Sequence, residues 1–219
     1  MPTYVLTGVE GKVSSIAASY ALTLAQPTDT LIFTSPCPAF IPRPLFEACT
    51  ASSAHVRILM VSYNDPANLA RAFSGADVVA FVSSPNYLAG AARRAQHRNV
   101  IEAAQRARIR RIVYMSLVGA ESGETDDGAA ALAVARDHAF TERLVRESGL
   151  VWNVQRNCLF VDSVAPVPVA TDKTTAEPEE IQKKWKHAAL VAREDCGRVL
   201  GALLMGKGEP NKVYIVAGP

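Results

Sequence analysis

The stretch Val5-Leu6-Thr7-Gly8-Val9-Glu10-Gly11-Lys12-Val13-Ser14 decides the fold of this 219-residue chain. An apolar, strand-like run leads into two glycines, and a helical pattern follows them. This order is typical of the start of a βαβ unit that binds a dinucleotide, because N–H groups at a helix N-terminus hold the diphosphate. The helix dipole also favours the negative charge. A side chain at Gly8 or Gly11 would block that approach.

The glycine motif is incomplete, since Ser14 stands where a third glycine commonly lies. A glycine there allows the helix to pack closely on the strand, and serine is the smallest polar substitute. The alternative is a plain strand-to-helix turn in an unrelated α/β protein, because short glycine motifs recur by chance.

The composition predicts one ordinary globular domain. Apolar residues make up 49% of the chain, charged residues 20%, and the net charge is +2, which favours neither nucleic acid nor a membrane as a partner. The basic run 106–111 has no interleaved aromatic residues, so a solvated helix end explains it better than nucleic-acid binding. No apolar run reaches the ~20 residues of a membrane helix.

The cysteines and the N-terminus predict a cytoplasmic protein. The four cysteines are scattered and form no C-x-x-C pair, which favours a reducing compartment. The N-terminus enters a strand almost at once, so we expect no signal peptide. Asp126-Asp127 lacks His or Cys neighbours at ligand spacing, and we expect no metal.

Strand-like and helical segments alternate along the chain. Strands are expected at residues 4–7, 30–34, 55–61, 77–82, 111–115, 151–155 and 212–216. Helices are expected at residues 12–24, 68–73, 91–108, 129–148 and 195–205, the second capped by Asp65-Pro66. The prolines between residues 36 and 44 exclude a regular helix there. The alternation predicts a Rossmann-like, doubly wound parallel sheet with helices on both faces.

Six segments, taken in order, resemble one family. They are residues 7–12 (TGVEGK), 96–104 (QHRNVIEAA), 112–117 (IVYMSL), 148–150 with 155–157 (SGL, QRN), 191–195 (VARED) and 213–218 (VYIVAG). Together they resemble the NmrA-like branch of the atypical short-chain dehydrogenases, with the second-type NADPH quinone oxidoreductases as the nearest pattern. The resemblance implies NADP(H) binding and a small-molecule substrate in a cleft at the carboxyl ends of the strands.

Three features depart from the family pattern. Thr34-Ser35 stands where relatives commonly carry an arginine for the 2′-phosphate of NADP, so NAD(H) stays an alternative cofactor. The loop that follows is unusually rich in proline. The chain also ends where many relatives continue, which predicts a single domain with a core at 1–157 and a small or truncated substrate lobe at 158–219. The pocket is then open, completed by the partner of a homodimer, or missing a piece.

Cofactor contacts are expected from two groups of residues. The turn after the first strand supplies Gly8, Glu10, Gly11, Lys12 and Val13. The ends of later strands supply Thr34, Ser35, Asn64, Asp65, Ser83, Ser84 and Ser116, because ligands of open parallel sheets bind at carboxyl ends. Asn64 and Asp65 are placed to meet the adenine. For each strand-end residue the alternative is an ordinary polar group.

Candidate catalytic residues are fewer. The chain lacks the Tyr-x-x-x-Lys pair of typical short-chain dehydrogenases and carries His138-x-x-x-Glu142 on the corresponding helix. His138 is a candidate proton donor near neutral pH, and the alternative is a hydrogen bond within the fold. Tyr87 and Asn157 are expected to position the substrate, although Tyr87 is nearly as well explained as a surface residue.

Three functions are compatible with this pattern. The first is an NADP(H)-dependent oxidoreductase that reduces a quinone-like or other conjugated molecule, because hydroquinone oxygens take protons from water without an enzymatic acid. The second is a non-catalytic dinucleotide sensor of the NmrA type, which the missing tyrosine–lysine pair favours. The third is a non-redox biosynthetic enzyme, an isomerase or cyclase, that uses the same pocket.

Overall fold

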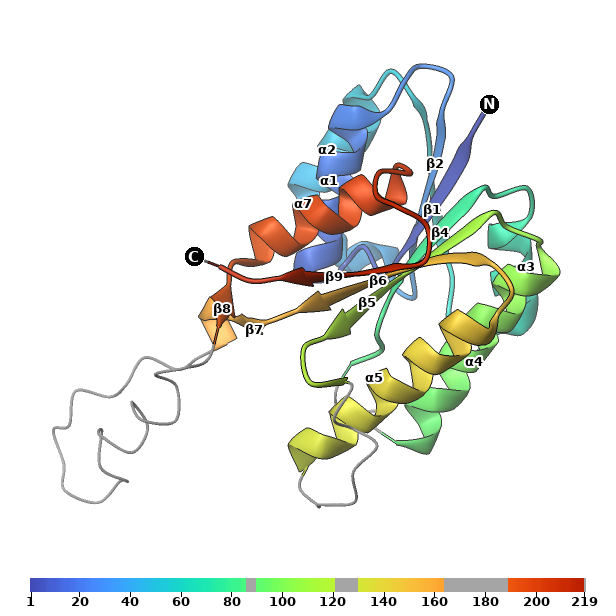
Figure 1. Cartoon of the computed structure of the whole chain (residues 1–219). Helices are drawn as coiled ribbons and strands as arrows, with labels where there is room; N and C mark the ends of the chain where they lie inside the picture. Colours follow the sequence, from blue (N-terminus) through green and yellow to red (C-terminus); the bar gives the residue numbers. More distant parts are fainter. Residues whose placement is uncertain (86–89, 121–129, 164–188, 219) are drawn as a thin grey trace, which may run out of the picture.

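A computed structural model of the chain describes residues 1–85, 90–120, 130–163 and 189–218. Its main feature is a sheet of seven parallel strands in the order β3-β2-β1-β4-β5-β6-β9 (Figure 1). The strands are β1 Thr3–Thr7, β2 Thr30–Ser35, β3 His55–Met60, β4 Val78–Val82, β5 Arg111–Leu117, β6 Val151–Asn157 and β9 Lys212–Val216. The strand order reverses between β1 and β4, as in doubly wound folds, and the predicted fold class is confirmed.

Helices cover both faces of the sheet (Figure 1). One face carries α1 Lys12–Leu24, α2 Arg43–Ala51 and α7 Arg193–Leu204. The other carries α3 Pro66–Phe73, α4 Ala91–Arg106 and α5 Ala130–Glu147. The hydrophobic core is accordingly split into two main layers, one against each face, and continuous apolar strands such as β4 supply side chains to both.

Local sequence explains most element ends. The Asp65 carboxylate accepts a hydrogen bond of 2.9 Å from the Asn68 N–H, so Asp65 caps α3 with Pro66 in the first helical position, as predicted. The strands β5 and β6 run two residues beyond their predicted ends, to Leu117 and Asn157. Three of the four extra residues, Ser116, Arg156 and Asn157, carry polar side chains at the carboxyl edge of the sheet.

The proline cluster corrects one prediction. A regular helix, α2, begins at Arg43 with Pro42 as its N-cap and Pro44 in its first turn. A short 3-10 turn, η1, precedes it at Pro38–Phe40. Prolines are tolerated here because the first N–H groups of a helix have no partner within it. The cluster therefore marks the start of a helix, and the prediction that these prolines exclude a regular helix was wrong.

The last quarter of the described chain belongs largely to the main body. Helix α7 packs along α1, and β9 extends the sheet beside β6. A small two-stranded parallel sheet, β7 Leu159–Phe160 with β8 Leu190–Val191, projects beyond the carboxyl ends of the large sheet, and a 3-10 turn, η4, follows β7 at Val161–Ser163 (Figure 1). Among the described helices, none is long and apolar enough to cross a membrane.

Candidate functional site

The turn between β1 and α1 is built around glycine. Gly8 has a φ of +66°, and a Cβ there would lie 2.6 Å from Cγ2 of Val82. A Cβ at Gly11 would lie 2.9 Å from Oγ of Ser14 and 3.2 Å from the Gly8 carbonyl oxygen. Ser14, at the third glycine position, donates its hydroxyl hydrogen to that same carbonyl. The turn is therefore closed by its own residues, and no side chain caps the N-terminus of α1.

A salt bridge connects this turn to the substrate-side segment. Nζ of Lys12 lies 3.4 Å from Oδ2 of Asp162, and Nε of Arg193 donates to both oxygens of the same carboxylate at 2.8 and 2.9 Å. The guanidinium of Arg193 also stacks over the Phe160 ring, 3.9 Å from its centroid. The two cations lower the pKa of Asp162, chiefly through the Arg193 hydrogen bond, so this carboxyl group stays ionised at neutral pH.

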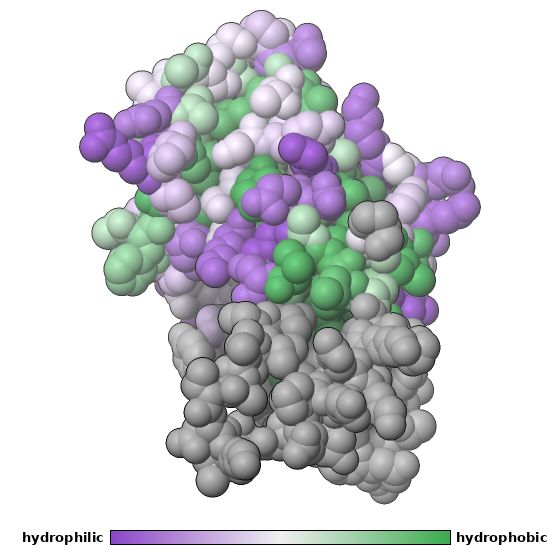
Figure 2. Space-filling model, turned by 90° about the vertical axis from the view of Figure 1, so that its left-hand side faces the viewer, coloured by the Kyte–Doolittle hydropathy of each residue, from purple (hydrophilic) through white to green (hydrophobic). Residues whose placement is uncertain are grey.

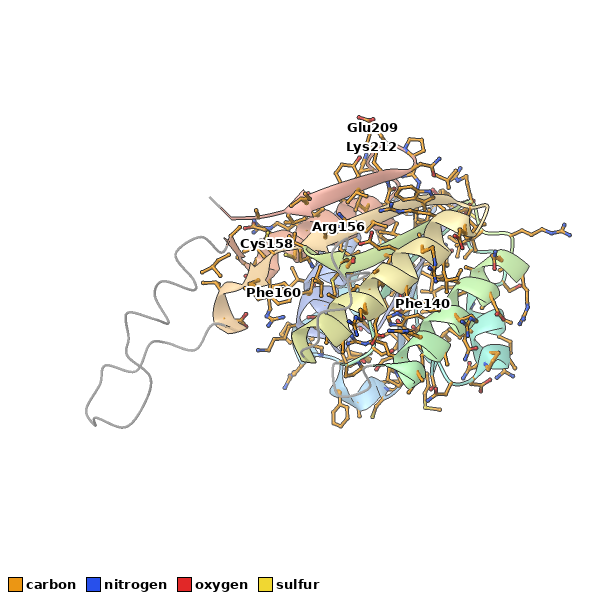
Figure 3. The ribbon with its side chains drawn as sticks, turned by 60° about the horizontal axis from the view of Figure 1, so that its bottom comes forward. Phe140, Arg156, Cys158, Phe160, Glu209 and Lys212 are labelled. Atoms are coloured by element: carbon orange, nitrogen blue, oxygen red, sulfur yellow. The ribbon has the colours of Figure 1, made fainter. Side chains whose placement is uncertain are left out.

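A cleft of about 830 Å³ opens at the carboxyl ends of β4, β5 and β6. Its lining includes five predicted site residues, Ser83, Ser84, Ser116, His138 and Asn157, with apolar side chains such as Met115, Leu117 and Val134 among them. Figure 2 views this end of the molecule, where hydrophobic and hydrophilic surface adjoin. Figure 3 labels Cys158, which lies between β6 and β7, and Phe160, which belongs to β7; both also line the cleft.

Ser83 and Ser84, which follow β4 and are called the β4 turn below, form the floor of the cleft. A buried histidine, His97, holds this turn in place. Nε2 of His97 accepts a hydrogen bond of 3.1 Å from the Ser84 N–H, so Nδ1 carries the hydrogen and donates to Oγ1 of Thr141 at 2.7 Å. Burial, together with the charges of His138 and Arg93, lowers the pKa of His97 to about 3. The imidazole is therefore neutral and acts as a fixed acceptor for the β4 turn.

A buried arginine completes this support. Nη2 of Arg93 donates to the Ser84 carbonyl oxygen at 2.6 Å, and its guanidinium lies 3.9 Å from the Asp137 carboxylate. Asp137 also accepts from the Gly90 N–H at 2.7 Å and from Arg94 Nε at 2.6 Å. The Ser84 hydroxyl donates to Gln96 at 2.5 Å. Both the backbone and the side chain of Ser84 are thus engaged within the protein.

His138 lies on the cleft side of α5 and is nearly fully buried. Its Nδ1 is 2.8 Å from the hydroxyl of Tyr114. Burial first, and then the charge of Arg93, lowers the pKa of His138 to about 3. Burial also raises the pKa of Tyr114. Because His138 is uncharged near neutral pH, the imidazolium that a proton donor would need is not available there.

Ser116 and Asn157 are held from the protein side. The Ser116 hydroxyl donates to Oε1 of Glu142 at 2.7 Å, and Arg156 donates to both oxygens of Glu142 at 2.9 and 2.8 Å. The Asn157 side-chain oxygen accepts from Gln155 Nε2 at 2.7 Å. Glu142 thus fixes the end of β5 and Gln155 fixes Asn157, whose amide nitrogen is its remaining polar atom.

The predicted adenosine-side residues are placed differently. Thr34 and Ser35 are buried at the end of β2, and the Ser35 hydroxyl accepts from the Cys37 N–H at 3.1 Å. Asn64 accepts from Gln96 at 3.0 Å, and Asp65 caps α3. These side chains serve the local fold in the structure, and their contacts with a cofactor stay predictions. Tyr87 lies outside the described residues.

Sequence reasoning missed the residues behind the cleft. Arg93, Tyr114 and Thr141 are fully buried and support the site from the protein side, yet none of them was a predicted site residue. His97, in the segment 96–104, is also fully buried and holds the backbone of Ser84. The signal that could have identified Arg93, His97 and Thr141 is the recurrence of polar residues on the core-facing stripe of predicted helices, where unpaired polar groups are costly, whereas Tyr114 lies on β5.

The geometry defines a class of protein, a doubly wound α/β domain with a dinucleotide cradle. Gly11 is the N-cap of α1 and no side chain caps this helix, so its first N–H groups, which have no partner within the helix, are available to a ligand. A cleft of a size that holds small ligands opens at the end of β4, the strand that pairs with β1. A nicotinamide dinucleotide fits this arrangement, with its diphosphate at the turn.

The family follows from sequence comparison. Residues 46–205 match the NAD(P)H-binding family model, and the chain belongs to that family. It is 27% identical over 173 residues to quinone oxidoreductase 2 of Escherichia coli and 28% identical over 160 residues to an NmrA-like oxidoreductase of Aspergillus flavus. These matches cover 78% and 73% of this chain but 56% and 48% of the relatives. The chain therefore spans about half the length of these relatives.

Solved structures show the same fold. The NADPH complex of the E. coli quinone oxidoreductase superposes with a TM-score of 0.69 at 24% identity, covering 98% of this chain and 69% of that one. Triphenylmethane reductase from Citrobacter, solved with NADP(H), gives a TM-score of 0.70 at 21% identity, with coverages of 100% and 70%. These structures confirm the Rossmann-like architecture, while the relatives found by sequence confirm the predicted resemblance to the NmrA-like oxidoreductases.

Proposed function

We propose that the chain is a NAD(P)H-dependent reductase of a quinone-like or other conjugated small molecule. The observation that carries the proposal is the cleft at the ends of β4, β5 and β6, which is largely apolar and contains His138 as a neutral imidazole. Such a cleft suits a flat acceptor whose reduction needs a hydride and no enzymatic acid. The relatives, a quinone oxidoreductase and an NmrA-like oxidoreductase, support the same class of reaction.

When bound, a reduced nicotinamide supplies the hydride. The residues of this chain bind and orient the reactants. The α1 N-terminus holds the diphosphate, and the β4 turn fixed by His97 and Arg93 forms the floor of the cleft. Hydride addition to a quinone leaves a negatively charged oxygen, and water supplies the proton that completes the hydroquinone.

His138 and Asn157 position the acceptor in this proposal. With the Tyr114 hydroxyl donating to Nδ1, the hydrogen of the neutral imidazole lies on Nε2, where it is available to an acceptor oxygen. The Asn157 amide nitrogen offers a second donor, because Gln155 occupies its oxygen. Both groups stabilise developing charge without giving up a proton. The free thiols at all four cysteines agree with a reducing, cytoplasmic setting.

The decisive experiment follows oxidation of NADH and of NADPH with benzoquinone, a larger conjugated quinone and a simple ketone. We expect turnover with the quinones and little with the ketone. Loss of substrate without cofactor oxidation would favour a non-redox enzyme. Cofactor binding without turnover of any acceptor would favour the sensor hypothesis, which a pull-down with and without dinucleotide then tests.

A further inference from the structure

The cleft at the ends of β4, β5 and β6 is larger than a single acceptor ring needs. Its volume is about 830 Å³. By comparison, an apolar cavity of about 150 Å³ is enough to hold benzene. A nicotinamide ring and its ribose would each take a share of that order, and space for more than one further ring would be left. The cleft therefore has room for a substituent on the acceptor.

The lining of the cleft changes from polar to apolar towards its mouth. Ser116 and Asn157, in the last residues of β5 and β6, are buried. Two positions further along the chain, Val118 and Leu159 are 40% and 48% exposed, and both line the cleft. The Val118 N–H donates to the Asn157 carbonyl oxygen at 3.0 Å, so the two segments stay joined where they leave the sheet. The hydrogen-bonding groups thus lie at the inner end and the apolar side chains at the outer end.

The apolar mouth, defined by Val118, Leu159 and Phe160, is held in a fixed position. Leu159 and Phe160 form β7, whose backbone pairs with β8 in the small sheet. The guanidinium of Arg193 stacks on the Phe160 ring, 3.9 Å from its centroid. Exposed apolar side chains that gather at one place on a protein commonly mark a binding surface, because covering them removes apolar area from water.

We propose that the acceptor carries an apolar tail, which the apolar mouth binds while His138 and Asn157 hold the oxygen of the reacting ring. The tail belongs to the acceptor because Val118 and Leu159 line the same cleft as these two polar residues, so one ligand reaches both ends. The inference rests on the proposed function and narrows it to quinones and related conjugated molecules that bear an apolar chain.

The test compares 2-methyl-, 2-propyl- and 2-pentyl-1,4-benzoquinone as acceptors, with oxidation of the reduced dinucleotide as the readout. The three quinones share one reacting ring and differ in the length of the tail. A methylene that is fully removed from water gains about fourfold in binding, and one that is half covered gains about twofold. We therefore expect kcat/KM to rise at least tenfold from the methyl to the pentyl quinone, mainly through a lower KM.

Two variants of Leu159 and one control locate the tail. Leu159→Gln keeps the size and places a polar amide at the mouth, so the rise along the series should shrink to less than threefold. Leu159→Met keeps an apolar side chain and should retain the rise. Met60→Gln is the matched control, because Met60 is an exposed apolar residue on β3, at the opposite edge of the sheet from β6 and β9. It should leave the rise unchanged.

Equal kcat/KM values for the three quinones, or the same rise in Leu159→Gln as in the unmodified protein, would overturn the inference. Failure to reduce any quinone would instead overturn the proposed function. Calorimetric titration with 4-methyl-, 4-propyl- and 4-pentylphenol, which need no turnover, then decides the inference separately. Affinity that grows with the tail and loses this growth in Leu159→Gln would support it, whereas affinity independent of the tail, or no binding of any phenol, would contradict it.

Discussion

The Tyr114 hydroxyl lies 2.8 Å from Nδ1 of His138, beneath a cleft in which His138 is the candidate for proton transfer. Both side chains are buried, and burial keeps both uncharged at neutral pH because it lowers the pKa of the histidine and raises that of the tyrosine. The pair therefore acts through a hydrogen bond between two neutral groups. It differs in kind from the tyrosine–lysine pair of typical short-chain dehydrogenases, in which the tyrosine gives a proton.

Replacement of His138 should slow quinone reduction only modestly. His138→Ala removes one neutral donor, and water still protonates the product, so we expect a loss within ~10²-fold. Steady-state oxidation of NADH with benzoquinone across pH 6 to 8 measures it. Because the pKa of His138 is about 3, this group should contribute no ionisation to the rate profile in that range.

The turnover of the Asn157→Ala variant is to be compared with that of His138→Ala. Asn157 is expected to hold the acceptor against the nicotinamide, where small misplacements are costly, so its loss should reduce turnover more than His138→Ala does. A far larger loss for His138→Ala, with folding and cofactor binding intact, would identify the histidine as a required acid and would favour reduction of a carbonyl group.

The two buried histidines predict a loss of stability in acid. His97 and His138 each have a pKa of about 3 in the folded protein against 6.5 as the ordinary value. The unfolded chain therefore binds more protons below pH 6.5, and the free energy of unfolding should fall as the pH drops from 6.5 towards 3. At full slope each histidine contributes about 1.4 kcal/mol per pH unit.

Urea unfolding between pH 7.5 and pH 4.5 measures this dependence. His97→Gln keeps an acceptor for the Ser84 N–H and removes one titrating group, so it should flatten the curve even though it lowers stability at pH 7.5. His55→Gln is the control, because His55 is exposed on β3. Equal slopes in the His97→Gln and unmodified proteins would contradict the assignment.

The ion pair beneath Ser116 should matter more than a surface pair. Glu142 is 5% exposed and binds Arg156 through both oxygens, whereas the Arg43–Glu47 pair is 89% and 61% exposed. Glu142→Gln should lower the free energy of unfolding by about 3 kcal/mol, because it breaks a buried charge pair. Glu47→Gln should change it by about 0.5 kcal/mol or less. Denaturant unfolding of both variants checks the difference.

Much of the fold could be predicted from the sequence, because buried parallel strands read as continuous apolar runs and helices show apolar residues that recur every three to four positions. Helix α1 and strand β9 have the predicted bounds. The failure at α2 has a local cause, since proline removes a donor that a helix start does not use. The close packing of α7 on α1 was not foreseen, although Gly197 and Gly201 permit it: a Cβ at either would lie within 2.7 Å of α1 atoms.

For the candidate site, the sequence predicts which residues lie at the strand ends, but it does not predict what their side chains bind. Strand ends identify Ser83, Ser84, Ser116 and Asn157, and the structure brings all four to one cleft. What their side chains bind depends on partners distant in sequence, such as Glu142 for Ser116. The protonation of His138 depends on burial and on Arg93, neither of which appears in a local pattern.

The last prediction concerns dinucleotide binding by the turn between β1 and α1, tested at Gly11 and Ser14. Gly11→Val should abolish dinucleotide binding, because the new Cβ enters the phosphate approach and would lie 2.9 Å from Oγ of Ser14. Ser14→Gly restores the third glycine, and it should retain binding while losing the hydrogen bond to the Gly8 carbonyl, at a cost to stability of about 1 kcal/mol.

Calorimetric titration measures both affinities, and thermal unfolding separates loss of the site from loss of the fold. Unchanged affinity in a folded Gly11→Val protein would show that the diphosphate lies elsewhere. Lost binding in Ser14→Gly with normal folding would mean that the serine hydroxyl, rather than the open turn, is what the diphosphate requires.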